Sequence, residues 1–89
     1  MKLDDIRKQI SHIDRQILER LNQRMSLSLQ VKKLKSKIKD PKREIQVLNQ
    51  INKETNGFDL VRRKFAKKIF KKIILESRKI QKNKQKEES

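Results

Sequence analysis

The sequence lacks most of the residues that form functional sites in small proteins. It has no cysteine and one histidine, His12, among its 89 residues, which excludes a disulfide-stabilised scaffold and a zinc module. The longest apolar run, Ile73–Leu75, is far shorter than the roughly 20 residues that a membrane-spanning helix needs. Residues 1–5 form no apolar segment of the kind found in secretion signals. We therefore expect a cytoplasmic protein with no membrane partner and no bound metal.

Glycine and proline are equally scarce, with one residue of each. Because these residues interrupt helices, and because no segment alternates apolar and polar residues as a strand does, the sequence predicts an all-α fold. The three aromatic residues are phenylalanines outside any glycine-rich strand pattern. This argues against the base-stacking surfaces that bind single-stranded nucleic acids.

Acidic residues are few relative to basic ones, since 11 oppose 26 and leave a formal charge of +15. Residues 1–44 carry +7 and residues 45–89 carry +8, so the excess forms no basic arm. Such a charge is typical of proteins that bind phosphate backbones. A general enrichment in lysine produces the same charge without a functional meaning, so the charge alone leaves both interpretations open.

An apolar stripe with helical spacing begins near the N-terminus, and neither glycine nor proline interrupts it up to residue 38. Its first members recur at intervals of three and four residues: Leu3, Ile6, Ile10, Ile13 and Ile17. The pattern predicts a first helix of about 34 residues, or about 50 Å. Because a compact chain of this length is roughly 30 Å across, a second copy of the chain is the simplest cover for the stripe.

Helix-capping residues divide the rest of the chain. Asp40 and Pro41 suit the N-cap and first position of a short second helix, which Asn56-Gly57 would end. Asp59 would cap a third helix that starts at Leu60. The third helix carries an apolar face: Val61, Phe65, Ile69, Phe70, Ile73 and Ile80.

The predicted architecture is therefore three helices that are long, short and long. We expect one domain over residues 1–82. Residues 83–89 contain no apolar side chain and should form a polar tail that frays.

Polar residues occupy positions where the helical stripes predict apolar ones. Arg24 and Lys35 share one face of the first helix, and Ser77 and Gln81 continue the stripe of the third. Buried cations and polar groups need partners. The two cations either extend to solvent, pair with an acid or meet an anionic ligand, and the two neutral residues either mark a helix end leaving the core or belong to a site.

The start of the second helix adds Asp40, Arg43 and Glu44. Capping, helix-dipole stabilisation and surface exposure would explain these residues individually. Together with the four polar residues in the stripes, however, they form a cation-rich set that suits a small ligand with carboxylates and a hydroxyl. No glycine-rich phosphate loop and no nucleophile–base pair is visible.

Taken in order along the chain, these residues resemble the all-helical (AroQ-class) chorismate mutase family over residues 3–82. The matching segments are 3–10, 13–14, 21–24, Val31 with Lys35, 40–44, and 73–77 with Gln81. The resemblance implies an intertwined helical-bundle homodimer. It also implies the isomerisation of chorismate to prephenate in phenylalanine and tyrosine biosynthesis, without a cofactor or a metal.

The resemblance also assigns carboxylate-binding residues. Arg7 and Arg24 would hold the two carboxylates of chorismate, with Ser77 assisting at a carboxylate and Arg43 supporting that side from just outside. Because Arg7 and Arg24 are 17 residues apart, or about 25 Å along one helix, both serve one site only if Arg7 comes from the partner subunit.

The remaining roles concern the ether bond and the ring. Lys35 and Gln81 would donate to the ether oxygen of the breaking bond, and Glu44 with Asp40 would bind the ring hydroxyl. Only four residues separate Lys35 from Asp40, which is short for this family.

Three alternatives stay open. The related isochorismate pyruvate lyase generally lacks the acid after the arginine of the second helix, whereas Glu44 is present here, so the mutase is favoured. A basic nucleic-acid-binding protein gives no reason for Ser77 and Gln81 to interrupt a core stripe, and we expect no nucleic-acid partner. A catalytically silent dimerisation module is the third.

Overall fold

Three α-helices and one short 3-10 helix make up the described part of the chain, which is residues 1–34 and 39–88, with side chains as far as Asn83. In the computed structural model, α1 spans Leu3–Leu34, α2 spans Pro41–Glu54, η1 spans Thr55–Gly57 and α3 spans Arg63–Glu88. No strand occurs among these residues. The prediction of an all-α fold with long, short and long helices is confirmed.

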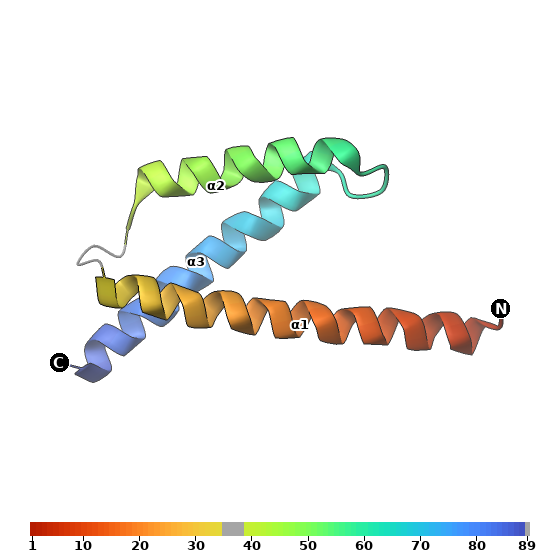
Figure 1. Cartoon of the computed structure of the whole chain (residues 1–89), viewed down its shortest axis with the longest axis horizontal. Coiled ribbons are helices and arrows are strands. Elements are labelled where there is room, and N and C mark those ends of the chain that lie inside the picture. The colour runs from red at the N-terminus through yellow and green to blue at the C-terminus, as the bar shows by residue number, and fades with distance from the viewer. Residues whose placement is uncertain (35–38, 89) are drawn as a thin grey trace.

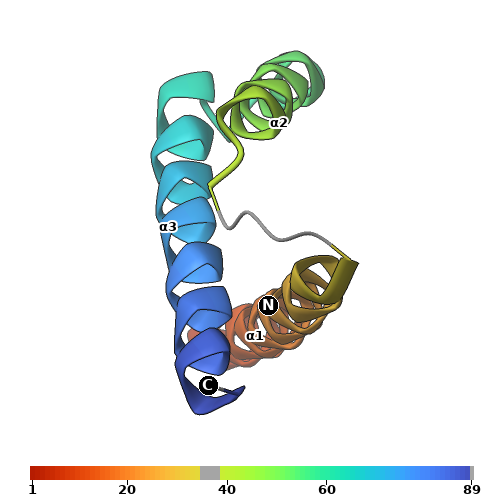
Figure 2. The same cartoon turned by 90° about the vertical axis from the view of Figure 1, so that its left-hand side faces the viewer.

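The two other α-helices both pack on α3. α2 lies against its N-terminal half, and α1 crosses it nearer the C-terminal end (Figures 1 and 2). Neighbouring residues of α3 bond to both helices, since Ser77 accepts from Arg24 of α1 and Arg78 donates to Glu44 of α2. The C-terminal half of α1 and the start of α2 therefore meet at the same stretch of α3.

Asp40 caps α2 as its sequence predicts. Its Oδ1 accepts a hydrogen bond from the backbone N–H of Arg43 at 3.2 Å, and Pro41 follows at the first helical position. The cap satisfies one of the free N–H groups of the first turn. It also fixes the direction in which the first turn of α2 presents its side chains.

The C-terminal end of α2 differs from the prediction. The helix ends at Glu54 and continues into η1, and Gly57 does not adopt a positive φ, so it is not the left-handed cap that its sequence suggests. Thr55 closes the helix instead, because its buried hydroxyl lies 3.0 Å from the carbonyl oxygens of both Ile51 and Asn52.

Replacing Thr55 with valine should therefore destabilise the fold. The isosteric change removes the hydroxyl donor from two partly buried carbonyls, and we expect the free energy of unfolding to fall by about 1 kcal/mol. Urea unfolding followed by helical circular dichroism, at one protein concentration, measures this. Thr55→Ser is the control because it keeps the hydroxyl, and a valine variant more stable than the serine variant would contradict the role.

α3 differs from its predicted bounds at both ends. It begins at Arg63 rather than Leu60, because its first hydrogen bond runs from the N–H of Ala66 to the carbonyl of Arg62, at 3.0 Å, and the preceding residues form the turn from α2. Its backbone is helical as far as Glu88, through most of the segment expected to fray. Lysine, glutamine and glutamate favour helix, which accounts for the continuation.

The chain has little apolar core of its own. Ala66 is the one buried apolar residue among those described, and α1 buries none. The radius of gyration is 16.2 Å, against about 12 Å for a compact chain of this length. The N-terminal half of α1 extends beyond the other helices (Figure 1). Its stripe is between 43% and 60% exposed: Leu3, Ile6, Ile10, Ile13 and Ile17.

Candidate active site

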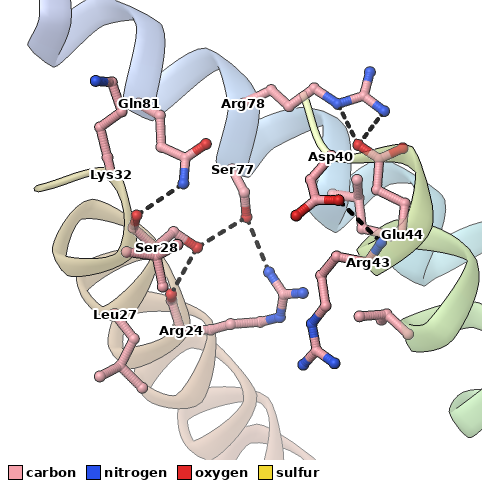
Figure 3. A pocket seen from close by; sticks show the side chains of 13 residues that line it. Arg24, Leu27, Ser28, Lys32, Asp40, Arg43, Glu44, Ser77, Arg78 and Gln81 are labelled. Carbon is pink, nitrogen blue, oxygen red and sulfur yellow. Dashed lines mark hydrogen bonds and ion pairs between the residues drawn. The ribbon is translucent and has the colours of Figure 1, made fainter. Parts of the chain in front are cut away.

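A cavity of about 310 Å³ lies where the three α-helices meet. Guanidinium, carboxylate, hydroxyl and amide groups share its wall with a few aliphatic side chains (Figure 3). The lining residues are Arg24, Leu27, Ser28, Val31 and Lys32 of α1, Asp40, Arg43, Glu44 and Val47 at and after the start of α2, and Ile74, Ser77, Arg78 and Gln81 of α3.

Ser77 links α3 to α1 through a hydrogen-bonded network. The Nη1 of Arg24 donates to the Oγ of Ser77 at 2.9 Å, and the hydroxyl of Ser28 lies 3.3 Å from the same oxygen. Ser28 also contacts the carbonyl of Arg24, at 3.0 Å. Ser77 is 8% exposed, so its place in an apolar stripe is explained by partners from the facing helix.

Gln81 makes the second polar link between these helices. It is also 8% exposed, and its Nε2 donates to the backbone carbonyl of Ser28 at 2.8 Å. A side-chain amide has two N–H groups, so one of them remains for a ligand in the cavity. The α1 carbonyl holds the Gln81 amide at the cavity wall.

Two guanidinium groups, of Arg24 and Arg43, face each other in the cavity (Figure 3). Burial, and to a smaller degree the charge of Arg43, lowers the pKa of the Arg24 guanidinium below its ordinary value. Within residues 1–34 and 39–83 neither arginine forms an ion pair with a carboxylate. Arg43 reaches Gln46 at 3.5 Å, and Arg24 reaches the neutral Ser77. The positive charge of the two groups is therefore poorly compensated.

Glu44 pairs with a residue of another helix at the cavity. The Nε of Arg78 donates to its Oε1 at 2.7 Å, and the Nη2 of Arg78 contacts the same oxygen. The two side chains are 29% and 22% exposed, so the pair is shielded from solvent more than an ordinary surface pair is. It joins α2 to α3 at the rim of the site.

One of three comparisons with known proteins found a match. The family model described as chorismate mutase type II matches residues 6–82. The chain belongs to this family. The comparisons with curated proteins and with solved structures gave no match. The resemblance seen in the sequence is therefore confirmed at the level of the chorismate mutase type II family, which indicates a chorismate-converting isomerase.

Six of the eight residues that the resemblance assigns line this single cavity: Arg24, Asp40, Arg43, Glu44, Ser77 and Gln81. Arg7 does not line it. It is exposed on α1, about 25 Å from Arg24 along the helix axis. Lys35 lies outside the described residues.

Three polar lining residues did not stand out in the sequence: Ser28, Lys32 and Arg78. Two of them have the property that identified the other site residues, which is a polar side chain at helical spacing on an apolar stripe. Ser28 follows Arg24 by four residues on the same stripe, and Arg78 follows Ile74 by four residues on the side of α3 next to the cavity. For Lys32 the pattern offers no comparable signal.

The described residues contain neither a cluster of metal-ligating side chains nor a membrane-spanning helix. No three histidine, cysteine, aspartate or glutamate side chains gather there as metal ligands. No described helix is long and apolar enough to cross a membrane. His12 is exposed in the N-terminal half of α1 and does not line the cavity.

Proposed function

We propose that the cavity binds chorismate and isomerises it to prephenate. One observation carries the proposal: the partly buried Arg24 and the more exposed Arg43 line one cavity without a carboxylate partner among the described residues. Chorismate is a dianion, and its carboxylates would supply the missing charge through strong charge-assisted hydrogen bonds. Arg24 would hold one carboxylate with the help of Ser77, and Arg43 would support that side.

The reaction needs no acid, base or nucleophile. It is a unimolecular [3,3] rearrangement in which the ether C–O bond breaks and a C–C bond forms, while negative charge builds on the ether oxygen. The site selects the compact substrate conformer and stabilises the charge that appears in the transition state. In our proposal the free N–H of Gln81 and the ammonium of Lys35 donate to the ether oxygen, and no cofactor takes part.

The substrate's ring hydroxyl would lie at the start of α2. Glu44 lines the cavity there, and Asp40 lies one helical turn earlier at its N-cap. An ionised carboxylate accepts a hydrogen bond from a hydroxyl readily. An acceptor at the start of α2 would orient the ring relative to the carboxylates.

The proposed site is completed by a second copy of the chain. Arg7 is too far from Arg24 to share a ligand within one protomer, and the stripe that carries Ile6 and Ile10 is exposed. An intertwined homodimer would cover the stripe and bring the partner's Arg7 to this cavity. Two equivalent sites then follow from the two-fold symmetry. We place this enzyme in the cytoplasmic synthesis of phenylalanine and tyrosine.

Two separate incubations test the function against its nearest alternative. The purified protein is given chorismate in one and isochorismate in the other. We expect prephenate from chorismate. Pyruvate released only from isochorismate would assign the lyase instead, and binding of duplex DNA with a steep salt dependence, without either product, would support the nucleic-acid alternative.

A further inference from the structure

The ion pair between Glu44 and Arg78 has no role in the mechanism given above. It is the one ion pair that joins two helices in the part of the chain that the structure describes. Arg78 comes from α3, next to Ser77, and both members of the pair line the cavity. An ion pair that only held the two helices together would not need to line the cavity.

The geometry of the pair leaves half of the carboxylate available. Both guanidinium nitrogens that reach Glu44 contact Oε1. No described hydrogen bond uses Oε2, although a carboxylate has acceptor capacity on both oxygens. The contact therefore fixes the carboxylate through one oxygen and leaves the other for a donor from a ligand.

We propose that Arg78 is a positioning residue that holds Glu44 as an oriented, charge-compensated acceptor for the substrate's ring hydroxyl. The inference rests on the proposed function of this cavity. Arg78 acts through two effects. It restrains the carboxylate so that Oε2 can accept the hydroxyl, and it offsets a negative charge that would otherwise repel a dianionic substrate.

The inference predicts a specific kinetic change. Replacing Arg78 with methionine or with glutamine leaves the Glu44 charge uncompensated beside the substrate, so KM for chorismate should rise about tenfold. The kcat should change by less than about threefold, because the ether-oxygen donors are untouched. Arg78→Lys keeps the charge and should restore most of the affinity. Lys79→Met removes a neighbouring exposed charge of α3 and serves as the matched control.

A double-mutant cycle separates positioning from a merely structural tether. In a Glu44→Gln background there is no charge to compensate, so Arg78→Met should alter KM by less than about twofold. An ion pair that only held α2 and α3 together would give a different pattern. The rise in KM would then follow the loss of helical stability in each variant, and Arg78→Lys would not restore the affinity. If Arg78→Met does not fold, the comparison of Arg78→Gln with Arg78→Lys decides the question.

The outcomes also separate this inference from the proposed function. If the unaltered protein forms no prephenate, the proposed function has failed. If it forms prephenate, but Arg78→Met behaves like Lys79→Met or has the same effect with and without the Glu44 carboxylate, only the role of Arg78 is overturned. A rise in KM that depends on Glu44 and is reversed by lysine supports it.

Discussion

Replacing Arg24 with methionine is expected to lower kcat/KM for chorismate by a factor on the order of 10²–10³. The guanidinium is partly buried, and its hydrogen bond to the Ser77 hydroxyl already directs it into the cavity. Methionine keeps much of the side-chain volume but removes the charge and every donor. Initial rates of chorismate consumption, over a range of concentrations, measure the change.

The matched control for this variant is Arg20→Met. Arg20 lies one turn earlier on α1 and is exposed, and the one described side-chain partner of its guanidinium is Gln23 of the same helix. The Arg20→Met variant loses the same charge from the same helix, so we expect its rates to stay near those of the unaltered protein. Equal losses in the two variants would show that the total charge, and not a carboxylate contact at Arg24, governs activity.

Mixing two inactive variants is expected to restore activity. Arg7→Ala and Arg24→Ala each disable both sites of the proposed homodimer, because every site takes Arg24 from one chain and Arg7 from the other. A mixed dimer regains one intact site, since one chain contributes Arg24 and its partner contributes Arg7. Random exchange makes half of the dimers mixed, so about a quarter of the unaltered activity should return.

The mixing experiment needs evidence that subunits exchange. Chains carrying different tags, refolded together and isolated through both tags, give the mixed dimer directly. Its activity should reach about half that of the unaltered dimer. An isolated mixed dimer without activity would contradict the shared site, and so would a protein that sediments as a monomer while turning over chorismate at the full rate.

The sequence predicted the parts of the fold that depend on local pattern. The stripe from Leu3 to Ile17 specified a long first helix because its period is set by helix geometry alone, and Asp40 specified the start of α2 because a cap acts within one turn. The ends near Gly57 and Leu60 were wrong because they depend on which groups bond to the free carbonyls and N–H groups of the helix ends. The Thr55 hydroxyl bonds to the last carbonyls of α2, and the carbonyl of Arg62 accepts from the N–H of Ala66 at the start of α3, and local pattern did not rank them.

The site was predictable to the extent that polar residues broke an apolar pattern. Ser77 and Gln81 stood out because an apolar residue was expected there, and both prove to be buried and bonded to α1. Arg78 was not singled out despite its spacing from Ile74, since an arginine is ordinary on a helix as rich in basic residues as α3. Its pairing with Glu44 depends on how α2 packs against α3, which spacing within either helix does not encode.

Most of the positive charge lies outside the site. Of the 26 basic residues, four line the cavity: Arg24, Lys32, Arg43 and Arg78. The proposed site adds Lys35 and the partner's Arg7. Among the described side chains, most of the remaining basic charge is exposed. It would favour the approach of a dianionic substrate, and activity should then fall as salt screens the field.

The formation of prephenate from chorismate tests the central claim most directly. Purified protein and the Arg24→Met variant are incubated with chorismate beside a blank without protein, and prephenate is quantified by nuclear magnetic resonance as chorismate disappears. We predict stoichiometric conversion by the unaltered protein, with the variant slowed by a factor on the order of 10²–10³. Conversion by the unaltered protein at the rate of the blank would contradict the account.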